Sequence, residues 1–140
     1  MSSKRIEDDI PSGFESSGFV GRYLEEGGPF YLKQEQDSCA VGLRISEQHI
    51  NYIDIAHGGV ITTLADIALS LQPYLSEMPH PTVTTTSLTV NFMTAANLGD
   101  WLEARATIDR LSKRTAHVHG SIKSGERIVA TASGIFGIYR

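Results

Sequence analysis

The stretch Asn51-Tyr-Ile-Asp-Ile-Ala-His57-Gly-Gly-Val-Ile-Thr-Thr-Leu-Ala-Asp66 places a glycine pair before an apolar run that carries a single carboxylate. Apolar residues recur at helical spacing from Gly59 to Leu71, which predicts a helix with one wide apolar face. Pro73 follows this run, and we expect the helix to end before it. The rest of the chain must cover the apolar face, so this stretch decides the architecture.

Two features of this helix point to chemistry. The Gly58-Gly59 start leaves backbone N–H groups free with the positive end of the helix dipole behind them, which makes a candidate oxyanion site. The alternative is that the pair only makes a tight turn into the helix. Asp66 is costly to bury on an apolar helix unless it is paired or used, so it is a candidate base. The alternative is an Asp that only hydrogen-bonds a neighbour.

The segments on both sides of the helix alternate with the period of β-strands. A strand pair is predicted over 30–45, and four longer strands over 82–93, 101–110, 115–123 and 127–139. Short turns make consecutive strands antiparallel neighbours. The predicted fold is therefore α+β, with one long central helix wrapped by a curved antiparallel sheet of five to six strands. The long strands leave an edge that needs protection, and pairing with a second chain would supply it.

Two finer expectations concern the first long strand and the N-terminus. Strict alternation over 82–93 places Thr84 and Thr86 on the face that carries Leu88, and Val83 and Thr85 on the opposite face. Residues 1–27 are expected to form an N-terminal segment with a possible short helix over 14–24, and residues 28–140 a single domain.

Composition excludes several classes of function. The 140 residues are 41% hydrophobic and 20% charged with a formal net charge of -4, which is typical of a soluble globular protein. No basic excess favours nucleic acid or an anionic membrane as a partner. The single cysteine, Cys39, allows no intrachain disulfide and fits a reducing compartment. No apolar run reaches the length of a membrane span, so we expect a cytoplasmic protein.

The spacing of these motifs resembles one enzyme family. Asn51, His57-Gly58-Gly59 and Asp66, followed by Val90-Asn91-Phe92, resemble the hotdog-fold acyl-CoA thioesterases of the phenylacetic-acid-pathway and 4-hydroxybenzoyl-CoA thioesterase type. That family usually shows Asn, six residues later His-Gly-Gly, and nine residues after that His an Asp. Both spacings hold here, and the resemblance covers roughly residues 28–139. The chain departs from the pattern at Asp54, where the family often has Gly, and in lacking a Pro after Met93.

The resemblance implies hydrolysis of an acyl-CoA thioester to a carboxylic acid and free CoA. CoA is then part of the substrate, and no metal or redox cofactor is expected. Asp66 would act as base or nucleophile, and the Gly58 N–H would polarise the carbonyl. His57 and Asn51 would orient the carbonyl or the water; the alternatives are a structural cap and a turn residue. Thr85 would hold the water, or serve as an ordinary strand residue.

Further contacts with the substrate are expected from Gly59, Thr63, Lys113 and Arg114. The two basic residues would meet CoA phosphates, with a solvated turn as the alternative. His117 and His119 have a spacing that suits zinc, but no third ligand is in register, so no metal site is expected. Candidates for an acyl pocket are Tyr52, Ile55, Leu69, Tyr74 and Leu75.

The helix geometry also predicts the assembly. His57 and Asp66 are nine residues apart, which at about 100° per residue places them on opposite sides of a helix. Two chains present both groups to one substrate more easily than one chain does. The resemblance implies the same arrangement, a homodimer with shared active sites in which Asn51, His57 and Gly58 of one subunit meet Asp66 of the other. It also implies a tetramer.

The sequence leaves two other functions open. One is a hotdog hydratase or dehydratase that acts on acyl thioesters through a His and an acidic partner. The other is a non-catalytic acyl-CoA-binding module. The Asp within the helix and the Gly58-Gly59 start favour the thioesterase.

Overall fold

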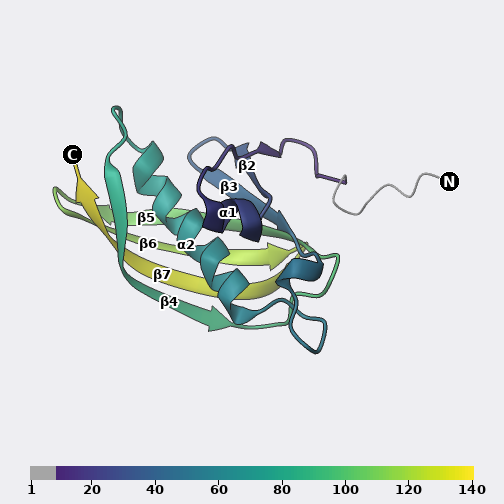
Figure 1. Cartoon of the computed structure of the whole chain (residues 1–140). Coiled ribbons are helices and arrows are strands. Elements are labelled where there is room, and N and C mark those ends of the chain that lie inside the picture. The colour runs from purple at the N-terminus through teal and green to yellow at the C-terminus, as the bar shows by residue number, and fades with distance from the viewer. Residues whose placement is uncertain (1–8) are drawn as a thin grey trace.

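One long helix and one curved sheet make up most of the molecule. The computed structural model describes residues 9–140, so residues 1–8 of the predicted N-terminal segment lie outside the described residues. Figure 1 shows helix α2 (Gly58–Leu75) lying across the sheet. The predicted α+β architecture, with a central helix and a curved antiparallel sheet, is confirmed. Within residues 9–140, no helix has the length and apolar character needed to cross a membrane.

Within residues 9–140 the sheet has seven strands in the order β1-β2-β3-β5-β6-β7-β4, and every neighbouring pair is antiparallel. Six of them correspond to the predicted strands, and the seventh is the two-residue β1. Their bounds are β1 Glu15–Ser16, β2 Phe30–Gln34, β3 Cys39–Arg44, β4 Thr82–Phe92, β5 Trp101–Leu111, β6 Thr115–Ser124 and β7 Arg127–Tyr139. Short turns join the neighbouring pairs β2–β3, β5–β6 and β6–β7. The expectation that consecutive strands are neighbours is wrong for β4 and β5, because β5 pairs with β3 and β4 pairs with β7 at the edge of the sheet.

The core lies between α2 and the concave face of the sheet. Leu64 and Ala68 of the helix are fully buried there, against small side chains of β5 and β6 such as Ala104 and Ala116. Gln72 is also buried, and its amide spans to β3. Its Oε1 accepts from the Cys39 N–H at 3.3 Å, and its Nε2 donates to the Cys39 carbonyl at 3.0 Å. A buried amide with these partners fixes the helix against the sheet.

The end of α2 differs from the sequence prediction. The helix does not stop before Pro73 but continues to Leu75. A proline in the last turn removes only one helical hydrogen bond, so the helix can pass through it near its end. Ser76 then closes the helix, since its N–H and its hydroxyl donate to the Pro73 carbonyl at 3.2 and 2.7 Å.

The N-terminal segment packs against the sheet and the helix. The short helix predicted over 14–24 is wrong in its position: α1 covers Arg22–Gly27. Gly18 and Gly21 have φ angles of 67° and 104°, which break any helix before Arg22. Upstream, the ring of Phe14 packs edge-on against Trp101 with centroids 5.2 Å apart.

We predict that Gly42→Ala destabilises the protein by about 1–3 kcal/mol, because overpacking forces buried neighbours to move. A Cβ at Gly42 would lie 2.2 Å from Cζ2 of Trp101. That indole is held by Phe14 and by Arg44, whose guanidinium lies 5.1 Å from the ring centroid. Urea denaturation measures the change.

Gly27→Ala is the matched control, since nothing lies within 4 Å of its Cβ position. We expect it to stay within about 0.5 kcal/mol of the wild type. Equal free energies of unfolding for the two variants would contradict the close packing of the Trp101 ring against Gly42 of β3.

Candidate functional site

The start of α2 presents free backbone donors. His57 is the N-cap residue, with φ -57° and ψ 144° and no capping hydrogen bond from its side chain. Its carbonyl accepts from the N–H groups of Val60 and Ile61 at 3.0 and 3.3 Å. Across the described part of the chain, the N–H groups of Gly58 and Gly59 donate to no backbone carbonyl. Both glycines are exposed, so these two donors are open to a ligand.

The loop before the helix is held by Asn51. Its Oδ1 accepts from the Ile53 and Ile55 N–H groups at 3.0 and 3.3 Å, so the side chain acts as a turn residue. Asp54 within this turn has a φ of 61°. This left-handed conformation explains why a glycine suits the position and why an Asp can replace it. The His57 N–H then donates to the His49 carbonyl at 2.9 Å, which anchors the helix start.

Asp66 and Thr85 form the second part of the site. Asp66 is half-buried on α2, and the Thr85 hydroxyl of β4 donates to its Oδ1 at 2.6 Å. Among residues 9–140 the other oxygen, Oδ2, has no hydrogen-bond partner. One carboxylate oxygen is therefore fixed and the other is available to a ligand.

A bulge in β4 makes this contact possible. The register with β7 shifts between Thr85 and Ser87, so the strict alternation predicted over 82–93 is wrong. Val83 and Leu88 both pack against the core, although strict alternation would place them on opposite faces. Thr86 is the extra residue, and it lets Thr85 face the helix on the same side as Leu88.

The two parts of the site do not meet within one chain. His57 and Asp66 are separated by nine residues, which is about 13 Å along the helix axis.

Lys113 and Arg114 are exposed in the turn between β5 and β6, and the Arg114 carbonyl accepts from the N–H of Ile138 at the end of β7. Strand β4 begins with Thr82 at the end of the sheet where this turn lies, and it ends with Phe92 beside Gly58. The basic turn and Gly58 of the same chain therefore lie at opposite ends of β4.

A cavity of about 460 Å³ at the helix start brings together three of the predicted site residues, His57, Gly59 and Thr63. Its other wall comes from α1, where the Tyr23 hydroxyl lies 2.8 Å from Oγ1 of Thr63. Tyr23 was missed by the sequence analysis, because only the folded chain brings it beside α2.

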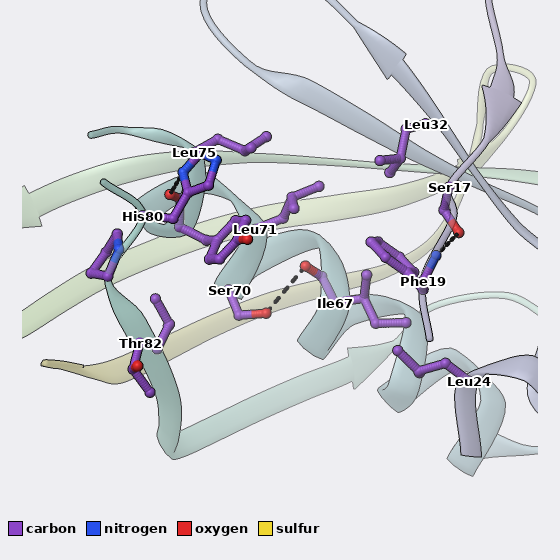
Figure 2. A pocket seen from close by; sticks show the side chains of 13 residues that line it. Ser17, Phe19, Leu24, Leu32, Ile67, Ser70, Leu71, Leu75, His80 and Thr82 are labelled. Atoms are coloured by element: carbon purple, nitrogen blue, oxygen red, sulfur yellow. Dashed lines mark hydrogen bonds between the residues drawn. The ribbon is translucent and has the colours of Figure 1, made fainter. Parts of the chain in front are cut away.

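A larger cavity of about 710 Å³ runs along α2 from Ile67 to Leu75 (Figure 2). Tyr74 and Leu75, two of the candidates for an acyl pocket, line this cavity. Three other residues predicted for such a pocket do not line it. Tyr52 is 95% exposed, Leu69 is buried in the core, and Ile55 lies in the loop before α2.

His117 and His119 project from β6 without forming a cluster of metal ligands. The His119 Nδ1 lies 2.7 Å from Oδ1 of Asp109 on the neighbouring strand. Within the described range of 9–140, no group of three or more His, Cys, Asp and Glu residues is placed to hold a metal ion.

A sequence profile of the thioesterase superfamily matches residues 53–131. The chain belongs to the thioesterase superfamily. The matched range contains Gly58, Asp66 and Thr85, whereas the N-terminal segment lies outside it. A protein of Pseudomonas aeruginosa that is provisionally named an esterase is 39% identical over 129 residues, covering 91% of this chain and 96% of the relative.

Solved structures place this thioesterase-superfamily chain in the predicted hotdog fold, which is thereby confirmed. The E. coli PaaI protein from the phenylacetic acid degradation operon aligns with a TM-score of 0.76 at 19% identity, covering 85% of this chain and 86% of that one. A Bacillus halodurans protein crystallised with CoA aligns with a TM-score of 0.71 at 24% identity, covering 78% of this chain and 73% of that one.

We predict that Asp54→Val destabilises the protein by about 1–2 kcal/mol, because a β-branched residue is strained in the left-handed region. Asp54→Gly is the comparison variant, which adopts that conformation without strain and should stay within about 1 kcal/mol of the wild type. Urea denaturation of both variants gives the two values. If valine were tolerated as well as glycine, the positive φ at Asp54 would be wrong.

Proposed function

We propose that this protein is an acyl-CoA thioesterase, with Asp66 as general base or nucleophile. The proposal rests above all on the half-buried Asp66 carboxylate, which Thr85 holds by one oxygen while the other stays open. Membership of the thioesterase superfamily supports the reaction class. The structural neighbour crystallised with CoA supports CoA as the carrier of the acyl group.

The hydrolysis needs a base and an oxyanion donor on one thioester carbonyl. As a base, Asp66 accepts a proton from water at Oδ2 while the water oxygen attacks the carbonyl carbon. The negative charge that forms on the carbonyl oxygen is stabilised by the N–H of Gly58 at the positive end of a helix. Collapse of the tetrahedral intermediate breaks the C–S bond and releases the CoA thiolate, which takes up a proton. As a nucleophile, Asp66 would form an acyl anhydride that water then cleaves.

We infer that the two halves of each site come from different subunits of a homodimer. Asp66 and the Gly58 N–H lie too far apart in one chain to act on the same carbonyl. Strand β4 is an eleven-residue sheet edge without a single charged side chain, which is the kind of edge that pairs with another strand. A two-fold axis between Leu88 and Thr89 would pair these edges in antiparallel fashion.

This axis would also assemble the site. In such a pairing, the numbers of two residues that lie opposite each other on the two β4 strands add up to 177. Thr85, which contacts Asp66, would therefore lie opposite the partner subunit's Phe92. Phe92 lies against Gly58 in each chain, with its Cζ 3.4 Å from the position of a Gly58 Cβ. Asp66 would therefore meet the partner subunit's Gly58. The partner subunit's Lys113 and Arg114 would come to the Gly58 end of this chain, where their charges suit the CoA phosphates.

We expect Asp66→Asn to lower kcat for thiol release from acyl-CoA by about a hundredfold or more, because an amide cannot accept the proton. Thr85→Val should cost about tenfold, because the carboxylate loses a hydrogen bond worth about 1.5 kcal/mol. Steady-state thiol release on short, medium, long and aromatic acyl-CoAs gives both values.

Asp109→Asn is the matched control, since this Asp pairs with His119 on the sheet and should leave the rate unchanged. Unaltered rates in Asp66→Asn would remove Asp66 from the chemistry. Tight acyl-CoA binding with no turnover by the wild type would identify a binding module instead.

A subunit-mixing experiment tests the shared site. Gly58→Pro removes the proposed donor, while proline suits the first helical position and His57 already has the extended conformation that precedes proline. We expect Gly58→Pro to lower kcat by about a hundredfold. Co-refolding it with Asp66→Asn in equal amounts should restore about a quarter of wild-type activity, because half of the dimers then carry one intact site.

Gly58→Ala keeps the N–H group and its Cβ meets no atom closer than 3.4 Å, so it serves as the control for the proline variant. A site built within one chain would leave both sites of every mixed dimer defective. Absence of recovery on mixing would therefore rule out the shared site.

A further inference from the structure

We propose that the N-terminal segment Ser17–Leu24 forms one wall of the pocket for the acyl tail, and that Phe19 sets the length of tail the pocket accepts. This inference rests on the proposed thioesterase function. It assigns a role to a segment that lies outside the range matched by the superfamily profile, residues 53–131.

The pocket is the cavity of about 710 Å³ along α2, which lies within the range of about 300–1,000 Å³ found for small-molecule sites. Figure 2 shows its two ends. At one end Phe19 and Leu24 of the N-terminal segment lie with Leu32 of β2 and Ile67 of α2. At the other end the cavity reaches His80 beyond the end of α2.

The middle of the cavity lies near the proposed base. Ser70 lines the cavity between its two ends and lies one helical turn beyond Asp66 on the same face of α2 (Figure 2). A thioester whose carbonyl is held at Asp66 therefore has its tail next to the cavity and can extend toward the Phe19 end.

The lining selects an unsubstituted apolar tail. Most of the lining side chains are aliphatic or aromatic, and Leu24, Leu32 and Ile67, which lie with Phe19 at one end, are all apolar. The Ser70 hydroxyl donates to the Asp66 carbonyl at 2.7 Å, and Nδ1 of His80 lies 2.9 Å from the Tyr74 carbonyl. At the Phe19 end a hydroxyl or charged group on the tail would lose its water without gaining a partner, which costs free energy. The substrate class is therefore acyl-CoAs with plain aliphatic or aryl tails.

The local backbone points Phe19 into the cavity. Gly18 has a φ of 67°, and the Phe19 N–H donates to the Ser17 hydroxyl at 3.2 Å, which shapes the turn. The Phe19 ring packs on Phe30 of β2, with centroids 6.4 Å apart. The next residue, Val20, is 82% exposed and lines no part of the cavity. Phe19 is thus held from the protein side and faces the tail with its other side.

The test compares three variants on a series of straight-chain acyl-CoAs. Phe19→Ala enlarges the cavity, so the ratio of kcat/KM for tetradecanoyl-CoA to that for octanoyl-CoA should rise about tenfold. Phe19→Trp reduces the space and should lower the same ratio. Val20→Ala is the matched control and should leave the ratio unchanged. Opposite shifts from two variants of one residue cannot come from partial unfolding, which would lower all rates together.

Calorimetric titration with decanoate provides a readout that does not depend on turnover. We expect Phe19→Ala to weaken decanoate binding about tenfold and Val20→Ala to leave it unchanged. If acyl-CoAs are hydrolysed but all variants have the same ratio of kcat/KM for the two acyl-CoAs, the thioesterase function holds and the role proposed for Phe19 is wrong. If the wild type hydrolyses no acyl-CoA, but binds decanoate more tightly than Phe19→Ala does, the pocket assignment holds and the proposed thioesterase function is wrong. If decanoate does not bind and no ratio shifts, the pocket is wrong.

Discussion

The burial of one face of α2 against the concave side of the sheet is the constraint on which the rest of this structure depends. Leu64 and Ala68 are fully buried, and each large aliphatic side chain removed from water contributes about 1.5–3 kcal/mol. The Gln72 amide adds a polar connection to β3 that allows only one position of the helix along the sheet. Because the helix cannot slide or rotate, its free N–H groups and its single carboxylate occupy fixed positions relative to β4.

The site uses the exposed part of the same helix, and the sheet has to adapt to it. Thr85 reaches Asp66 only because β4 carries an extra residue, which reverses the side on which Thr85 would otherwise lie. The bulge interrupts the regular pairing of β4 with β7 between Thr85 and Ser87. In return, the carboxylate has one oxygen, Oδ1, held by Thr85, while Oδ2 stays without a hydrogen-bond partner among residues 9–140.

The sequence predicted the helix and the strands whose apolar residues recur with a strong period. It did not predict features of segments in which that period is weak. Period 3.6 over Gly59–Leu71 and period 2 in the long strands reflect burial of one face, so both elements were predictable. The bulge was not, because Thr82–Phe92 is rich in hydroxyl residues that suit either face of a strand. The Asn51, His57 and Asp66 spacing indicated the candidate site, since it depends on a pattern within one short stretch of sequence. Phe19 was not found, because only long-range packing brings it to α2.

The uncharged edge of β4 also bears on how a single chain behaves before the proposed dimer forms. An eleven-residue strand with no Lys, Glu or Pro lacks the features by which sheet proteins avoid aggregation. A folded monomer therefore exposes a template on which other chains can add, and in the proposed assembly dimer formation would compete with misassembly. If the second copy binds only the folded state, the melting temperature would rise with protein concentration. The lifetime of the folded monomer in dilute solution would then depend on the rate at which it meets a second copy.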